Sequence, residues 1–529
     1  MLDTTKECLQ GKLLINTGPF RHQLRRMPQN GKRYRTEYIM QKNTVKSVTN
    51  GLIWTYAERI LAQFITILVT IILARMIAPD DYGLIAIVNV FINIANAFVT
   101  SGFGNALIQK KDADEVDFAT TFFFSLLFST GLYAIIFLSS DALAQFYRMP
   151  DLKLVTRIMA LRLPIAAINS IQHAYVSKQM AFKKFFFSTL GGTMISAMIG
   201  IGMAYAGAGI WALVAQYLTN VCIDTVVLCF TSGWHLKFCY SNQRMKSLFS
   251  YGWKIMFVGV MTTLYSNLRN LVIGKKYTSA DLAYSEKGEQ FPSAIAGNIN
   301  SSITKVLFPV LADCQNDKNQ LKRIVRRSIK VGAYVLFPVL FGLAMVSESF
   351  VRLLLTEEWI ECVPFLQVMC IVYALQPLQT ASLQCIKAVG KSGLYLWIDV
   401  LKKLIGIIVL LATVFMFDQV LIIIVGALFL EIISTLILVP VNRKLIDYTY
   451  LEQVMDVLPT LVLTAAMCVC VRIAGGWVQS SLCQLMVQIL AGLCTYVGLS
   501  IMTKNENFSY VLSIAKNMLG SHKSGKLLS

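Results

Sequence analysis

The sequence predicts an all-α integral membrane protein with about 14 transmembrane helices. Two observations support this prediction. Apolar stretches long enough to cross a bilayer follow one another with only short polar joints between them. The 529 residues are 56% hydrophobic and only 15% charged, with a mean hydropathy of +0.59, whereas soluble domains carry about 25% charged residues. Because lipid cannot satisfy backbone hydrogen bonds, apolar stretches without period-2 alternation are expected to be helices.

The apolar runs, bounded by charged residues or by Gly and Pro, place the expected helices in chain order. These ranges are 52–74, 83–108, 118–138, 155–176, 186–206, 208–231, 249–272, 281–311, 329–347, 361–386, 394–417, 419–439, 456–474 and 484–502.

The charges of the joints alternate along the chain. The joints after every second helix hold about 18 Lys and Arg, against about six in the other joints, which carry acidic residues such as Asp80, Asp81 and Glu357. The positive-inside rule therefore places the basic joints and both termini in the cytoplasm. This topology explains the net charge of +19 without a nucleic-acid partner. The 12 cysteines show no metal-binding spacing, so we expect no metal site and no cofactor.

The expected organisation is two six-helix lobes followed by two further helices. Matches 200 positions apart, such as Arg75 with Lys275 and Asp81 with Asp281, suggest a duplication, and an even number of crossings relates the repeats by a pseudo-twofold axis along the membrane normal. The predicted boundaries are 1–45 for a basic cytoplasmic tail, 46–240 for the N-lobe, 241–445 for the C-lobe, 446–503 for helices 13 and 14, and 504–529 for a cytoplasmic C-terminal tail. Translation from Met40 instead of Met1 is an alternative start.

Charged residues inside the apolar spans are the strongest functional candidates, because each costs about 2.5–3.5 kcal/mol at the centre of a membrane helix. Basic groups in a central cavity would suit a phosphate or pyrophosphate group. The candidates for substrate binding are Arg59, Arg157, Arg162, Lys254, Arg269 and Lys287. The alternative is that those near helix ends, such as Lys254 and Arg269, extend to the membrane interface. Glu286 and Glu289 are further charged residues in the same spans.

Four acidic residues in the spans, Glu58, Asp224, Asp399 and Glu431, are candidates for coupling transport to a proton or sodium ion. Each is equally compatible with a fixed ion pair. Glu58 and Arg59 are adjacent and cannot share a helix face, so each needs a partner on another helix.

Small residues and prolines add two structural expectations. Gly192, Ser196, Gly200 and Ala204 follow a four-residue spacing, which favours close approach of another helix. Pro164, Pro309, Pro338, Pro364 and Pro377 are expected within helices, where they would bend the helix. Such bends are hinge candidates for alternating access, and they are also common in static membrane helices.

Short motifs lie beside the expected helices along almost the whole chain. They are Arg75 to Gly83 after helix one, Gly102 to Gln109 at the end of helix two, Met180 to Lys183, Gly207 to Gln216, Phe308 to Gln315, and Glu358, Trp359 and Pro364. In this order and placement they resemble the pattern of the Wzx-type flippases, the polysaccharide transporter branch of the multidrug/oligosaccharidyl-lipid/polysaccharide exporter superfamily. Gly393 stands where the family often has an acidic residue, so no role is transferred there.

This resemblance implies transfer of an undecaprenyl-pyrophosphate-linked oligosaccharide from the cytoplasmic to the periplasmic leaflet of the bacterial inner membrane, by alternating access, for capsule, exopolysaccharide or O-antigen assembly. The implied partners are this lipid, the bilayer and glycan polymerase or other assembly proteins. Helices 13 and 14 match longer family members, and an apolar groove for the lipid tail is one use for them.

Three other functions stay open. A cation-coupled exporter of drugs or small molecules would share the architecture, although its cavity should be acidic or aromatic. A membrane-embedded glycan polymerase or ligase usually needs a large periplasmic loop, and no joint exceeds about 20 residues. A scaffold for glycan assembly proteins is the third.

Overall fold

The computed structural model describes residues 54–55, 57–478, 480–513 and 516. Throughout this part of the chain the structure is helical, which confirms the predicted all-α membrane fold. The predictions for the tail at 1–45, for a start at Met40 and for most of 504–529 lie outside the described residues.

After a first helix, Ala57–Ala74, the helices follow in the order predicted. They are α4 (Pro79–Thr100), α5 (Phe103–Gln109), α6 (Glu115–Tyr147), α7 (Leu152–Met159), α8 (Arg162–Lys178), α9 (Lys183–Tyr205), α10 (Ile210–Thr231), α11 (Asn242–Lys276), α12 (Ser279–Asp313), α13 (Lys318–Leu354), the 3-10 helix η2 (Glu357–Cys362), α14 (Val363–Ala374), α15 (Gln376–Ala388), α16 (Ser392–Met416), α17 (Val420–Ile446), α18 (Tyr450–Gly475) and α19 (Ser481–Met502).

Eleven helical segments among the described residues are long and apolar enough to cross a membrane. The helices α11, α12 and α16 occupy the places expected for spans 7, 8 and 11 but are not among these eleven. Their charged residues, such as Arg269, Lys287 and Lys402, make them more polar. The predicted count of 14 spans is therefore not confirmed.

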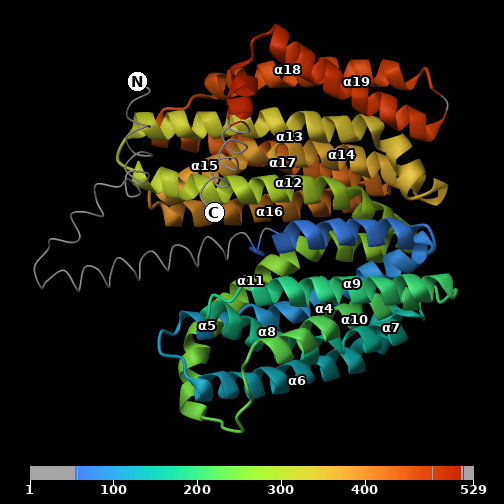
Figure 1. The fold of residues 1–529 in the computed structure, drawn as a ribbon, viewed down its shortest axis with the longest axis vertical. Coiled ribbons are helices and arrows are strands. Elements are labelled where there is room, and N and C mark those ends of the chain that lie inside the picture. Colours follow the sequence, from blue (N-terminus) through green and yellow to red (C-terminus); the bar gives the residue numbers. More distant parts are fainter. Residues whose placement is uncertain (1–53, 56, 479, 514–515, 517–529) are drawn as a thin grey trace, which may run out of the picture.

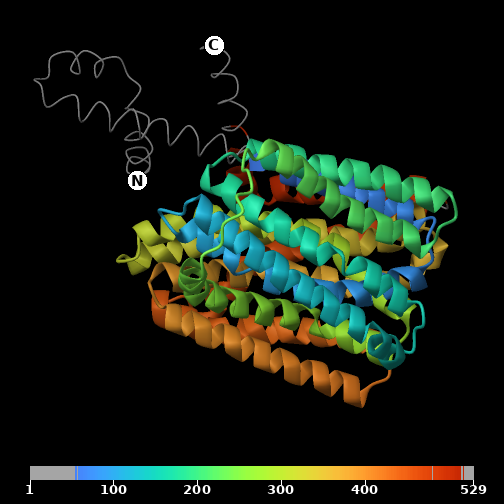
Figure 2. The same ribbon diagram turned by 90° about the horizontal axis from the view of Figure 1, so that it is seen from below.

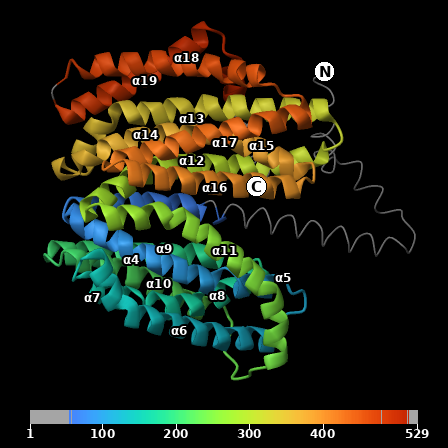
Figure 3. The same cartoon turned by 180° about the vertical axis from the view of Figure 1, so that it is seen from behind.

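The helices run side by side in two groups (Figures 1 and 3). The first helix group is α4–α10, and the second is α12–α17; the helix Ala57–Ala74 and α11 lie between them. The hairpin α18–α19 packs on α13, at the side of the second group away from the first. Figure 2 shows the same helices from below, in a bundle with roughly aligned axes. The predicted lobe boundaries and the pseudo-twofold axis stay predictions.

Three of the expected spans are divided into shorter helices. The second is split into α4 and α5 at Ser101 and Gly102. The fourth is split into α7 and α8 at Ala160 and Leu161. The tenth is split into α14 and α15 at Leu375. Pro377 lies in the first turn of α15, where a missing N–H costs no helical hydrogen bond.

The prolines therefore differ in their effect. Pro309 and Pro338 lie inside α12 and α13 without ending either helix. Pro364 and Pro377 begin new helices instead. Hinge motion at any of these prolines stays a prediction.

The small-residue stripe packs as expected. All four residues of the stripe on α9 are buried, and α9 lies against α10. A methyl group at Gly192 would lie 3.0 Å from the carbonyl oxygen of Asn220, and one at Gly200 would lie 3.0 Å from Gln216 Cβ. The expected close approach of another helix is confirmed.

Candidate functional site

Polar side chains from α11, α12 and α14 meet on the side of the second group that faces the first. Arg269 Nη2 donates to Glu289 Oε2 in an ion pair, and Tyr373 Oη donates to Glu289 Oε1 at 2.7 Å. One residue along α11, Asn270 Nδ2 donates to Glu286 Oε1 at 2.7 Å. These contacts fix two carboxylates and one guanidinium on neighbouring helix faces.

The first helix group contributes a second guanidinium opposite them. Arg162, in the first turn of α8, donates from Nη1 to Asn89 Oδ1 of α4 at 3.1 Å, and its guanidinium lies 5.2 Å from the centre of the Tyr217 ring of α10. Glu286 lies within Coulombic range of both Tyr217 and Arg269. The two sets of residues thus form one central polar cluster between the helix groups, comprising Asn89, Arg162, Tyr217, Arg269, Asn270, Glu286, Glu289 and Tyr373.

The cluster lies toward the end of the bundle at which α11 ends and α12 begins. Glu286 is seven residues from the start of α12, and Arg269 is seven from the end of α11, which places both about 10 Å from that end of the helices. The side chains of Arg269 and Glu289 keep 21% and 28% of their surface exposed. They therefore border accessible space instead of packed core.

The two arginines differ electrostatically. Glu289 compensates the charge of Arg269. Arg162 forms no ion pair with a carboxylate among the described residues, and its Nε is buried without a hydrogen-bond partner there. Burial of an Arg side chain between apolar helices without a counter-ion costs roughly several kcal/mol in desolvation free energy, and a bound anion offsets this cost. Arg162 is therefore the cation in the cluster best suited to bind an anionic ligand.

Three predicted substrate-binding residues lie away from this cluster. Arg157 donates to Ser140 Oγ at 2.8 Å and to Asp141 Oδ2 at 3.1 Å, on the last turns of α6, so it belongs to the rim of the first group. Arg59, in the first turn of the helix Ala57–Ala74, is exposed, and so is Lys254 on α11.

Lys287 is also outside the cluster, although it neighbours Glu286. It is only 7% exposed, and its ammonium lies 4.1 Å from the centre of the Tyr82 ring and 5.7 Å from that of Trp359. Lys287 thus faces the contact between α4 and η2 and turns away from the accessible space.

The motif after helix one joins the two helix groups at the end where Lys287 lies. Arg75 Nε donates to the carbonyl of Leu354 at 2.9 Å, and Trp359 Nε1 donates to the carbonyl of Ala74 at 2.8 Å. Tyr82 and Trp359 pack edge to face with ring centres 5.2 Å apart. The motif that carried the resemblance is therefore an interface between segments far apart in sequence.

Two of the predicted coupling carboxylates lie near each other, Glu58 on the helix Ala57–Ala74 and Asp224 on α10 of the first group. Thr189 Oγ1 donates to Glu58 Oε1 at 3.1 Å, and Asn169 Nδ2 donates to Asp224 Oδ2 at 2.8 Å. His173 Nε2 lies 3.8 Å from Asp224 Oδ2 and within Coulombic range of Glu58. Neither carboxylate forms an ion pair with Lys or Arg in the part of the chain that the structure describes.

The other two coupling candidates lie beside lysines in the second group. Lys403 Nζ lies 2.9 Å from Asp399 Oδ2. Lys402 is within Coulombic range of Glu431 and donates to Gln379 Oε1 at 2.5 Å. Asp399 thus forms an ion pair with a lysine, whereas Glu431 has a lysine within Coulombic range.

An apolar groove of about 230 Å³ runs between α15, α17 and α18. Its walls are mainly aliphatic and include Leu378, Ile432, Leu436, Val457 and Leu461. The groove lies on the far side of the second group from the first, where α18 meets α17. It fits a hydrocarbon chain better than a polar ligand.

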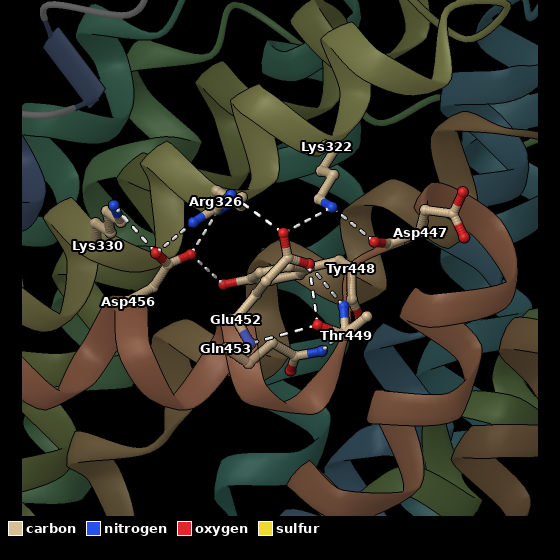
Figure 4. A network of polar contacts seen from close by, with 9 residues as sticks. All are labelled: Lys322, Arg326, Lys330, Asp447, Tyr448, Thr449, Glu452, Gln453 and Asp456. Atoms are coloured by element: carbon tan, nitrogen blue, oxygen red, sulfur yellow. Dashed lines mark hydrogen bonds and ion pairs between the residues drawn. The ribbon is translucent and has the colours of Figure 1, made fainter.

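A polar network fixes the α18 wall of this groove to α13 (Figure 4). Arg326 donates two hydrogen bonds to Asp456, from Nε and Nη2, each at 2.7 Å. Tyr448 Oη also donates to Asp456 at 2.8 Å, and Lys330 Nζ lies 3.0 Å away from it. Lys322 Nζ lies 2.9 Å from Glu452. The start of α18 is therefore held by charged groups on one face of α13.

Several members of the central cluster were absent from the predicted site. Asn89, Tyr217, Asn270 and Tyr373 are uncharged, and single polar residues in apolar helices are common. Glu289 was noted only as a charged residue in the span. These residues form a cluster only because they meet from five different helices, which the hydropathy along the sequence does not show.

The sequence family follows from a match over more than half of the chain. A family model described as "Polysaccharide biosynthesis protein" matches residues 72–364. The chain belongs to this polysaccharide biosynthesis protein family. The predicted membership among Wzx-type polysaccharide transporters is confirmed, and the protein is a multi-pass membrane transporter.

Relatives of this polysaccharide transporter come from several bacteria. It is 25% identical over 362 residues to the teichuronic acid biosynthesis protein TuaB of Bacillus subtilis, covering 67% of this chain and 74% of TuaB. It is 24% identical over 334 residues to the lipopolysaccharide biosynthesis protein WzxC of Escherichia coli, covering 62% and 67%. The succinoglycan biosynthesis transport protein ExoT of Rhizobium meliloti is 22% identical over 354 residues, covering 66% and 71%.

Solved structures share the fold of this transporter. The lipid II flippase MurJ in an inward closed conformation superposes with a TM-score of 0.67 at 14% identity, covering 86% of this chain and 99% of MurJ. An inward-facing multidrug resistance transporter of the MATE family superposes with a TM-score of 0.56 at 12% identity, covering 73% and 94%. At these identities the likeness concerns the fold.

Proposed function

We propose that this transporter moves an undecaprenyl-pyrophosphate-linked oligosaccharide from the cytoplasmic to the periplasmic leaflet of a bacterial inner membrane, for capsule, exopolysaccharide or O-antigen assembly. The observation that carries the proposal is Arg162, a cation without a carboxylate partner among the described residues, placed between the two helix groups opposite Arg269. A guanidinium pairs with pyrophosphate oxygens through two parallel hydrogen bonds. The family and the names of its relatives support a glycan as the cargo.

The other groups of the cluster suit the sugar next to the pyrophosphate. Carboxylate and amide groups such as Glu286 and Asn270 accept and donate hydrogen bonds to hydroxyl groups. The aromatic ring of Tyr217 adds an apolar surface for a sugar face. The lipid tail is proposed to lie in the apolar groove between α17 and α18, outside the polar interior.

Alternating access is the proposed mechanism. The helix groups contact each other where α4 begins and α12 begins, the end that the charge alternation assigns to the periplasm. In the proposed cycle this contact closes the central cluster on that side, and the exposed groups of the cluster would be reached from the cytoplasm. Reversal of the contact would release the head group to the periplasm.

Coupling to a proton or sodium ion is proposed for Glu58 and Asp224. Both lack an ion-pair partner from Lys or Arg among the described residues, whereas Asp399 has Lys403. A cation can therefore neutralise the first pair without displacing a lysine. Glu58→Gln with Asp224→Asn should abolish the dependence of transport on an ion gradient, and Asp399→Asn should retain that dependence.

The test of the function is transfer of a short-chain polyprenyl-pyrophosphate oligosaccharide between leaflets of reconstituted vesicles. Arg162→Gln removes a charge-assisted contact of about 1.5–3 kcal/mol, which corresponds to an affinity loss of about 10- to 150-fold. Arg472→Gln, at an exposed position in the last turn of α18, is the matched control and should transport normally. Wild-type affinity and transfer in Arg162→Gln would refute the assignment.

A further inference from the structure

Lys287 is a buried cation in a contact that must break during transport. Its ring partners come from different helix groups, because Tyr82 lies on α4 and Trp359 on η2. The ammonium therefore loses one partner and gains water whenever α4 leaves η2. This residue was predicted to bind substrate, yet it is separated from the accessible space.

The polar neighbours of Lys287 leave its charge poorly compensated. Its nearest hydrogen-bond acceptor is Gln290 Oε1, at 3.5 Å. Glu286 lies within Coulombic range of Lys287, and its carboxylate accepts a hydrogen bond from Asn270 of α11. No carboxylate in the described part of the chain forms an ion pair with Lys287. Apart from Gln290, the close partners of the ammonium among the described residues are the rings of Tyr82 and Trp359.

The neighbouring backbone makes the closed contact tight. A methyl group at Gly83 would lie 1.8 Å from the carbonyl oxygen of Ser279, so α4 and α12 touch directly at this point. Asp80 accepts a hydrogen bond from Ser279 Oγ across the same contact. We call this contact, formed by Asp80, Tyr82, Gly83, Ser279, Lys287 and Trp359, the outer latch.

We propose that the buried ammonium of Lys287 destabilises the closed outer latch and so enables it to open. Dehydration of an ammonium group costs free energy. The attraction to one ring at close range and to a second ring near the 6 Å limit of cation–π contacts recovers less than this cost. Opening lets water reach the ammonium and removes this cost. Tight packing at Gly83 and Asp80 closes the latch, and Lys287 keeps closure reversible.

The proposal rests on the proposed transport function, because opening matters only if cargo leaves at this end. The proposal nevertheless fixes the direction of the effect of Lys287 on the stability of the closed latch. If the cation–π contacts dominated, Lys287 would stabilise the closed latch. If it bound substrate, its removal would lower the affinity for the lipid and leave the latch unchanged.

The test measures latch closure by disulfide formation between cysteines introduced at Asp80 and Ser279, in a full-length variant whose 12 native cysteines are replaced. Lys287→Met keeps the length of the side chain without its charge. It should increase the cross-linking rate about tenfold or more, because the closed state no longer contains a dehydrated cation. Lys287→Arg keeps the charge and should behave like the parent.

Two further variants serve as controls. Lys387→Met removes an exposed lysine whose ammonium lies 4.2 Å from the Tyr395 ring within the second group, and it should not change cross-linking. Gly83→Ala should slow cross-linking, because its methyl group pushes α4 from α12. Membrane abundance and a single peak in size-exclusion chromatography verify that each variant is folded.

The transfer and binding assays separate this proposal from the proposed function. Lys287→Met should reduce leaflet transfer while the affinity for the short-chain lipid does not fall. Arg162→Gln should lower the affinity without changing cross-linking. Unchanged or slower cross-linking in Lys287→Met would overturn the role of Lys287, even with the function intact. Wild-type affinity in Arg162→Gln would overturn the function and leave the latch result standing.

Discussion

Asn in place of Asp456 should weaken the attachment of α18–α19 to α13. The carboxylate of Asp456 is 5% exposed and accepts hydrogen bonds from Arg326 and Tyr448 with Lys330 at ion-pair distance (Figure 4). Asp456→Asn keeps the shape of the side chain but removes its charge. Two cations are then left beside a neutral amide.

The expected size follows from the exposure of the partners. Removing one member of a buried ion pair costs about 3–5 kcal/mol. The side chains of Arg326 and Lys330 keep 32% and 29% exposure, so water can partly rehydrate them. We therefore expect a loss of about 2–3 kcal/mol in the free energy of opening of the α13–α18 contact.

Hydrogen–deuterium exchange of backbone amides in the first turns of α18 measures this opening. A loss of about 2–3 kcal/mol predicts exchange about 30- to 150-fold faster. Glu452→Gln is the matched control, because Glu452 is 31% exposed and paired with Lys322 at 2.9 Å. Its effect should stay below about 1 kcal/mol.

Two results would contradict this reasoning. Exchange in Asp456→Asn at the wild-type rate would mean that apolar packing alone holds α18. Equal effects of Asp456→Asn and Glu452→Gln would mean that burial of the carboxylate does not determine its contribution.

Three further changes test other parts of the structure. Gly200→Val should lower stability by about 1–3 kcal/mol, measured as thermal unfolding in detergent, because its side chain would collide with Gln216; unchanged unfolding would contradict the close approach. Arg244 holds the pKa of Asp114 at about 2. The resulting stability is present above the usual pKa near 4 and is lost as the pH falls toward 2. The difference in melting temperature between wild type and Arg244→Gln should therefore shrink between these two pH values. Arg59→Gln, at an exposed position, should change substrate affinity by less than about threefold, and a larger loss would place Arg59 in the site.

Much of the fold is readable from the sequence because hydropathy acts locally. Each apolar run is helical at the predicted place, three of them as two shorter helices, since lipid forces every span to satisfy its own backbone. The small-residue stripe likewise predicted the close packing of α9. The helix breaks were less accessible: the interruption at Ala160 and Leu161 follows no strong local signal, and Pro377 was expected inside a helix where it begins one.

The candidate site was only partly accessible from the sequence. Charge inside a span identified Arg162 and Arg269, because burial of a cation is costly wherever it occurs. The direction of a side chain depends on neighbours from distant segments, as the ring of Trp359 shows for Lys287. Whether a cation borders accessible space or packs between rings is therefore a property of the assembled helices.

The attachment of the hairpin α18–α19 to α13 has a mechanical consequence. Among the described residues, the hairpin packs on α13 and α17 of the second helix group, so in the proposed alternating access it would move together with that group. A hydrocarbon chain that rests against α18 would move with the second helix group, while the polar end of the lipid is transferred between the two helix groups. The head group and the tail of the lipid would then follow different paths, and the tail would stay beside α18 throughout the cycle.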